Sequence, residues 1–216
     1  MRQMKFSMVA AALVLLGTQG AVQAQTAAEV DALTKKALAS FHSKGIAKAD
    51  RLIQDDSNRL CSEADASGKP LDAATAKAIE EANLKVIHWP AGGQFLGDWK
   101  KGEKIAQSGK GMTWKDKDVY NNGGNCYNCH QINKAEVSYG TIGPSLWNYG
   151  KLRGVTDPSS AASAEIVKYT WGKIWNARAY NACSNMPRAG HNGVLTEDQV
   201  RDIMALLLDP KSPVNQ

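Results

Sequence analysis

The sequence has no strong excess of charge of either sign, because its 216 residues include 26 Lys and Arg against 21 Asp and Glu. A protein whose main partner is a nucleic acid carries a much more basic patch or stripe, so the balance argues against this class. The sequence also lacks an internal repeat, and it lacks an alternating apolar and polar run long enough to build a sheet. These absences favour an all-α fold.

Long hydrophobic runs are absent beyond the N-terminus. There, Arg2 and Lys5 precede an apolar run over residues 8–16, and small residues follow up to Ala24. This order is typical of a secretory signal peptide that is cleaved after Ala24. The alternative is a membrane anchor, but the run is well short of the roughly 20 residues that cross a bilayer. We therefore expect residues 1–24 to be removed on export to the periplasm, which leaves a mature chain without a membrane span.

The mature chain keeps a mild positive charge, since removal of two basic residues leaves 24 − 21 = +3. Lysines cluster in one segment, at Lys100, Lys101, Lys104, Lys110, Lys115 and Lys117. The simpler interpretation is a solvated helix face, and we favour it. The alternative is a docking surface for an acidic redox partner.

Residues 28–84 are rich in Ala, Lys, Glu and Asp, with apolar residues at helical intervals. The pattern predicts a first helix that ends at Gly45, a second over residues 48–64, and a third that begins at Asp72 and continues to about Leu84. A glycine-bearing link at residues 90–93 follows. We therefore expect three parts: the signal peptide at 1–24, a helical N-terminal extension at 25–90 and a second domain at 91–216.

The second domain is predicted to begin with a helix over residues 98–108 and to contain another over 163–175. Its last helix has the clearest signals in the chain. Thr196 and Gln199 form a capping box at its start, and Pro210 stops it. The domain is therefore bounded by two helices.

Cysteine is scarce, and two of the four cysteines stand in residues 126–130, which read Cys-Tyr-Asn-Cys-His. This C-x-x-C-H pattern is typical of covalent haem attachment. The thiols of Cys126 and Cys129 can each add to one vinyl group of the same porphyrin, and His130 then reaches the iron from the same face. A thioredoxin-like redox pair would require a preceding strand, and half of a zinc site would require a second pair of ligands elsewhere in the chain. Neither context is present. The single motif predicts one covalently bound haem c.

The iron needs a second axial ligand opposite His130, and a methionine thioether is the usual choice for electron transfer because it raises the reduction potential. Met204 belongs to the apolar face of the last helix, and Met112 precedes the motif. Met186 lies in a loop between the motif and the last helix, so it is the predicted ligand. His191, in the same loop, is the alternative and would lower the potential.

From Gly97 to the C-terminus, the order of features resembles a class I cytochrome c: a helix, C-x-x-C-H, a Gly-Pro-x-Leu loop, a methionine-proline loop and a closing helix. The resemblance implies the all-α class I cytochrome c fold. It also implies that the carbonyl of Pro144 accepts a hydrogen bond from His130, which fixes the tautomer and ring plane of the imidazole.

Within this class, residues 183–188, 191–193, 195–196 and 205–210 resemble the SoxX family, the monohaem subunit of the SoxAX complex. In that family the complex oxidatively joins thiosulfate to a cysteine of the SoxYZ carrier and releases two electrons, and the bond-forming site lies on the SoxA partner. The resemblance implies that this chain carries no catalytic residue. It would be the electron-transfer subunit of an L-cysteine S-thiosulfotransferase, in a heterodimer with a SoxA-type cytochrome, and would pass electrons to a small cytochrome c.

The rival interpretation is a free-standing periplasmic cytochrome c that shuttles electrons between a dehydrogenase and an oxidase. A shuttle needs only a small haem domain. The resemblance to SoxX does not cover the helical extension before Pro90. That extension favours a stable partner surface over a free shuttle.

Cys61 and Cys183 are the remaining pair, in a chain expected to reach an oxidising compartment. We therefore expect a disulfide between them, which would tie the extension to the loop that carries Met186. The alternatives are two separate buried thiols, or a bridge from Cys61 to a partner chain.

Overall fold

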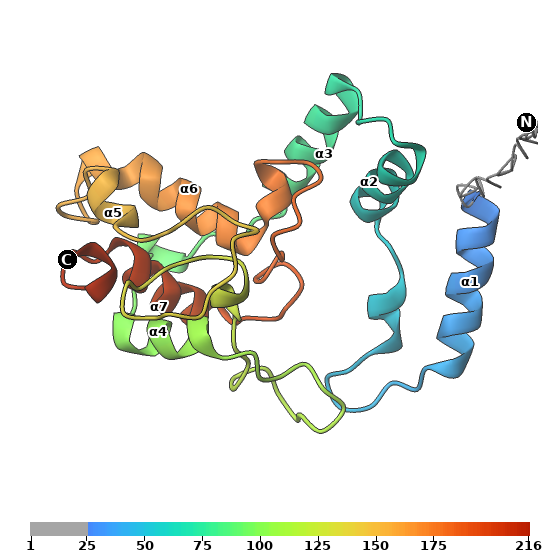
Figure 1. Ribbon diagram of the computed structural model, residues 1–216, viewed down its shortest axis with the longest axis horizontal. Coiled ribbons are helices and arrows are strands. Elements are labelled where there is room, and N and C mark those ends of the chain that lie inside the picture. Colours follow the sequence, from blue (N-terminus) through green and yellow to red (C-terminus); the bar gives the residue numbers. More distant parts are fainter. Residues whose placement is uncertain (1–25) are drawn as a thin grey trace, which may run out of the picture.

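The computed structural model describes residues 26–216, and within that range it contains helices and turns but no strand (Figure 1). The α-helices are α1 (Ala27–Ser40), α2 (Asp56–Ser67), α3 (Ala73–Lys85), α4 (Trp99–Gln107), α5 (Tyr149–Leu152), α6 (Ala164–Trp175) and α7 (Glu197–Leu208). Short 3-10 helices lie between and after them: η1 (Ala49–Leu52), η2 (Ala91–Gly93), η3 (Cys126–Asn128), η4 (Ala161–Ser163), η5 (Ala177–Ala179) and η6 (Pro213–Asn215). The predicted all-α fold is confirmed, whereas the predicted signal peptide lies outside the described residues. None of the described helices combines the length and the apolar character needed to cross a bilayer.

The core forms where α4 crosses α7, with α6 beside them (Figure 1). Gly102 permits this crossing, because a Cβ added there would collide with the backbone carbonyl of Asp202. Backbone N–H groups just before α4 also donate to α7, from Gly97 to the carbonyl of Arg201 at 2.9 Å and from Asp98 to the Asp202 carboxylate at 2.8 Å. The first and last helices of the domain therefore hold one another in place.

Helix α7 begins as the sequence predicts. The hydroxyl of Thr196 accepts a hydrogen bond from the N–H of Gln199, and the Gln199 side chain accepts one from the N–H of Thr196. The apolar face of α7, which consists of Val200, Ile203, Met204 and Leu207 at helical intervals, is buried. The capping box therefore fixes where α7 starts, and burial of its apolar face fixes how it lies on the core.

The extension departs from the predicted helices at two points. α1 stops before Gly45, which instead lies in a tight turn at φ +58°, where an added Cβ would press on the carbonyl of Asp116. The helix predicted over residues 48–64 is divided into η1 and α2. The division occurs because Asp55 adopts an extended backbone and caps α2, with its carboxylate accepting the N–H of Asn58 at 2.8 Å. Local side-chain capping thus overrides the longer apolar pattern.

Helix α3 joins the extension to the core. The amide of the buried Asn176 donates to the Asn83 side chain on α3 at 2.9 Å, and the indole of Trp171 donates to the carbonyl of His88 at 2.8 Å. Ile87 belongs to the same core cluster. By contrast, α1 lies far from this core and contacts η1 (Figure 1). Residues before and after the link at 90–93 pack on one core, so core packing does not divide the chain at this link. The domain boundary there stays a prediction.

Candidate haem site

The C-x-x-C-H motif lies on a tight turn. The N–H groups of Cys129 and His130 both donate to the carbonyl of Cys126, at 3.1 and 3.0 Å. Asn125 enters the turn from the left-handed region, at φ 51°. The turn gathers two thiols and an imidazole on one short stretch, which attachment to a single porphyrin requires.

Both motif cysteines are free thiols of intermediate burial. Burial raises the pKa of Cys126 to about 12, so this group is a neutral thiol at neutral pH. Cys126 also packs against the core cluster. The pair is therefore held at the edge of the core and is not consumed by a disulfide, as attachment of haem through two thioether bonds requires.

The imidazole of His130 is oriented by Pro144. Its Nδ1 lies 2.7 Å from the Pro144 carbonyl oxygen, which can only accept, so Nδ1 carries the proton and donates. Nε2 is then the unprotonated nitrogen, which is the one that can bind a metal. The contact that the class I resemblance implies is present. The role of His130 as an iron ligand stays a prediction.

Gly143 is a second constraint on His130, because a Cβ added there would collide with the face of the imidazole. We expect Gly143→Ala to displace the ring and to lower the free energy of unfolding of the haem-loaded protein by about 1–3 kcal/mol, the usual cost of overpacking. Denaturant unfolding followed by haem absorbance measures this. Gly109→Ala is the matched control, because Gly109 lies outside the left-handed region and its added Cβ would come no closer than 3.3 Å to another atom, in the side chain of Asn125. Equal losses in the two variants would contradict the prediction.

Met186 lies in the loop between η5 and α7 and packs, partly buried, against the core cluster. Two competing thioethers are engaged elsewhere. Met204 is fully buried inside α7, and the sulfur of Met112 accepts hydrogen bonds from the Asn122 amide at 3.0 Å and the Arg51 guanidinium at 3.6 Å. These contacts favour Met186 among the methionines, and its ligand role stays a prediction.

His191 lies in the same loop as Met186, where its backbone N–H donates to the carbonyl of Trp175 at 3.0 Å. Burial, and then the nearby charge of Arg188, lower the pKa of His191 and favour its neutral form. A neutral imidazole can bind iron, so His191 stays the alternative ligand.

The residues present fit a haem c. Two free thiols three positions apart provide the covalent links, and His130 offers only Nε2 to a metal because Nδ1 is engaged by Pro144. A thioether and an imidazole are the donor pair that holds the haem iron of cytochromes c. When bound, the group supplies an iron that alternates between two oxidation states. The chain itself supplies the attachment, the orientation of the imidazole and the surrounding apolar core.

Sequence reasoning missed a polar pair beside the motif. The hydroxyl of Tyr127, inside the motif, donates to Glu103 Oε1 at 3.0 Å and accepts the N–H of Asn133 at 3.0 Å. The other carboxylate oxygen of Glu103 is buried and has no hydrogen-bond partner among the described residues. Burial raises the pKa of Glu103. In the sequence, Glu103 stands among lysines on a predicted helix and looks like an ordinary surface charge.

We expect Glu103→Gln to raise the free energy of unfolding by about 1 kcal/mol at neutral pH, because it removes a partly desolvated charge and keeps an oxygen for Tyr127. Because the pKa of Glu103 is raised in the folded state, its charged carboxylate destabilises the fold above that pKa. This destabilisation is relieved as the pH falls through the pKa. The gain should therefore vanish in acid. Denaturant unfolding at several pH values checks this, with the exposed Glu81→Gln as a control. A loss of stability at neutral pH would refute the prediction.

The expected disulfide is present between Cys61 on α2 and Cys183 in the loop of Met186, with Cα atoms 5.5 Å apart. This confirms the pairing and excludes the two alternatives within the described residues. Cys183 lies three positions before Met186. The extension is therefore covalently fastened to the loop that carries the predicted sixth ligand.

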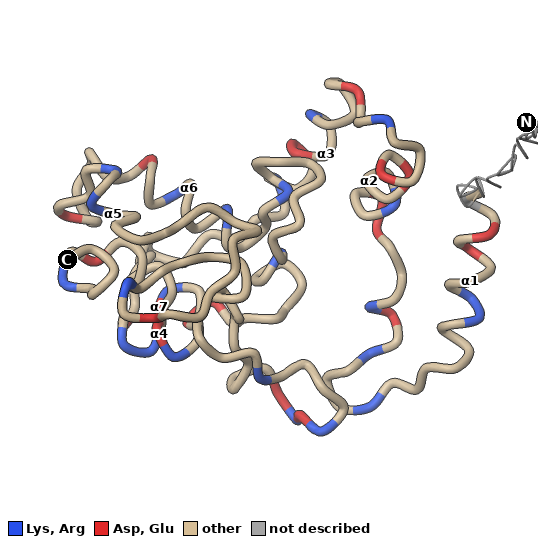
Figure 2. The backbone as a smooth tube through the Cα atoms, in the orientation of Figure 1, with Lys and Arg blue, Asp and Glu red and all other residues tan. Residues whose placement is uncertain are grey.

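The six clustered lysines are all exposed, and Figure 2 shows basic residues gathered along α4. None of them makes an ion pair within residues 26–216. Lys100 lies over the ring of Trp99, at 5.6 Å from its centre. Both interpretations of this cluster, a solvated face and a docking surface, stay open.

The fold and the site together define a helical domain whose C-x-x-C-H motif lies on a turn and whose residues fit a haem c. Residues 115–210 match the model of the family described as cytochrome c, so this part of the chain is a cytochrome c domain, which implies covalently bound haem c and haem-based electron transfer. The chain is also similar to an uncharacterized lipoprotein of Aquifex aeolicus (strain VF5), with 36% identity over 148 residues. The match covers 68% of this chain and 66% of that protein's own length.

Proposed function

We propose that this chain is the monohaem electron-transfer subunit of a SoxAX-type complex. The observation that carries the proposal is the likeness of residues 183–188, 191–193, 195–196 and 205–210 to the SoxX family, in a cytochrome c domain. The bridged extension supports it, because the Cys61–Cys183 disulfide fixes a helical segment that a free shuttle does not need. One C-x-x-C-H motif supports one haem c per chain.

In the proposed reaction, a carrier cysteine thiol and thiosulfate join by a new S–S bond on the partner chain. The balance is RSH + S₂O₃²⁻ → RS–S–SO₃⁻ + H⁺ + 2e⁻. A chain with one haem accepts one electron at a time, so the second electron requires a second turnover or another redox centre on the partner. Residues of this chain hold the haem, with His130 oriented by Pro144, and they do not touch the sulfur substrate.

We place the mature protein outside the cytoplasm, in the periplasm. The order of residues 1–24 is typical of a signal peptide, and haem attachment through thioether bonds is consistent with an exported protein. A relative is named a lipoprotein, which agrees with export of that protein.

Co-purification from the periplasm tests the proposal. We expect a heterodimer with a second c-type cytochrome that survives a wash at about 1 M salt, where the Debye length is only about 3 Å. Thiosulfate should reduce the haem of this chain only when that partner and a carrier with a free cysteine are both present. A chain that elutes alone, and that exchanges electrons rapidly with a dehydrogenase and an oxidase, would support the shuttle instead. The six exposed lysines are the feature that favours this second function.

A further inference from the structure

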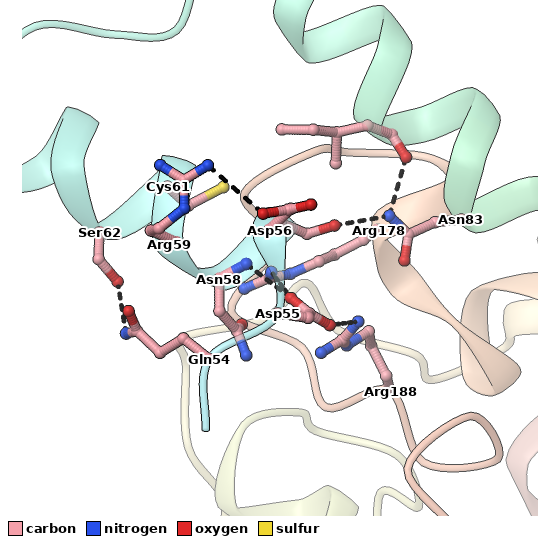
Figure 3. Close-up of polar contacts among 12 residues, drawn as sticks. Gln54, Asp55, Asp56, Asn58, Arg59, Cys61, Ser62, Asn83, Arg178 and Arg188 are labelled. Carbon is pink, nitrogen blue, oxygen red and sulfur yellow. Dashed lines mark hydrogen bonds and ion pairs between the residues drawn. The ribbon is translucent and has the colours of Figure 1, made fainter. Parts of the chain in front are cut away.

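A charged cluster joins the extension to the loop of Met186. The carboxylate of Asp55, just before α2, lies 2.6 Å from a guanidinium nitrogen of Arg188 and 3.8 Å from one of Arg178 (Figure 3). The same carboxylate caps α2 by accepting the N–H of Asn58 at 2.8 Å. Asp55 therefore links the start of α2 to two arginines that come from η5 and from the loop after it.

The cluster is unbalanced in charge. The side chains of Arg188 and Arg178 are only 8% and 12% exposed, and within the described residues no carboxylate other than Asp55 pairs with either. One guanidinium nitrogen of Arg178 is buried without a hydrogen-bond partner in the described part of the chain. Removing the single counter-charge would leave two buried cations facing one another, and this is far more costly than losing an exposed ion pair.

The two attachments of α2 lie on either side of Met186. Cys183, three residues before it, is bonded to Cys61 within α2, and Arg188, two residues after it, is paired with Asp55 at the start of the same helix. Residues 180–195 contain no helix, so this loop depends on such contacts for its position. Helix α2 therefore holds the loop at both ends of a six-residue span.

We propose that Asp55 is a positioning residue that, together with the Cys61–Cys183 disulfide, clamps the Met186 loop onto α2 and keeps the thioether on the haem iron. The inference rests on the proposed ligation by Met186. Asp55 does not touch the haem, and it acts through Arg188. The extension is then an internal support of the haem site, which is a role beyond that of a partner surface.

Exogenous imidazole reports on this clamp, because it binds the ferric iron only when the loop opens and the thioether leaves. Its apparent affinity therefore rises in proportion to the open fraction. In the haem-loaded full protein, Asp55→Asn removes the charge but keeps an equally good helix cap. We expect it to tighten imidazole binding by about tenfold and to speed amide hydrogen exchange in residues 183–191.

The adjacent Asp56→Asn is the matched control, because the Asp56 side chain is 91% exposed and, within residues 26–216, forms an ion pair only with Arg59 of the same helix. It should leave imidazole affinity within about twofold of the native protein. Adding Arg188→Gln to Asp55→Asn removes one of the two uncompensated cations, so the double variant should recover part of the lost protection.

Native imidazole affinity together with native exchange in Asp55→Asn would overturn the clamp while leaving the Met186 assignment standing. A Met186→Ala variant run in parallel separates the two claims. If it keeps the thioether spectrum of the native ferric protein, the ligand assignment fails, and with it the effect of the clamp on the iron. Hydrogen exchange, which does not depend on the iron ligand, then shows whether Asp55 still holds the loop.

Discussion

Met186→Ala is expected to leave the haem attached and to lower its reduction potential by on the order of 100 mV or more, since axial ligands set haem potentials over a range of about 0.8 V. The soft thioether stabilises ferrous iron more than water or histidine does, so its loss favours the ferric state. Spectroelectrochemical titration measures the potential, and the ferric absorption spectrum reports the ligand.

Met112→Ala is the matched control for this prediction, because the Met112 sulfur is held by Asn122 and Arg51. It should leave the potential unchanged. An unchanged potential and spectrum in Met186→Ala would instead assign the sixth position to His191 or Met112.

Replacing both Cys61 and Cys183 by serine is expected to lower the free energy of unfolding by roughly 5 kcal/mol in the chain-entropy model, because the bridge closes a loop with a sequence separation of 122. Both sites should change together, since either single cysteine left behind is free to form wrong bridges. Guanidinium unfolding of the haem-loaded variant, beside the native protein with and without reductant, measures the loss.

Thiol titration provides the control for the bridge. The denatured, unreduced native protein should show no free thiol, because two cysteines are bridged and two carry haem. A double serine variant within about 1 kcal/mol of the native protein would contradict the predicted contribution.

Three of the helices that could be predicted begin at a local side-chain cap. Thr196 and Gln199 cap α7, and Asp72 and Asp98 cap α3 and α4. The predicted end of the first helix of the extension is wrong. α1 ends at Ser40, and Gly45 lies in a turn that meets a distant loop, a contact that a local sequence pattern does not reveal.

The candidate site likewise has a part that the sequence predicts and a part that it does not. The thiols, His130 and Pro144 follow from a short motif and a family pattern, so their contact could be anticipated. The pairing of Asp55 with Arg188 joins segments far apart in the chain, and no spacing rule marks either residue. The sequence does not reveal the burial of Glu103 for the same reason, because this burial depends on the tertiary fold that brings Tyr127 against it.

Mass spectrometry of the denatured mature chain tests the central claim most directly, namely that Cys126 and Cys129 bind one haem covalently. The account predicts a chain that carries the mass of one haem and releases none into acidified organic solvent. A chain at the mass of the bare polypeptide, or haem that passes into the solvent, would contradict it.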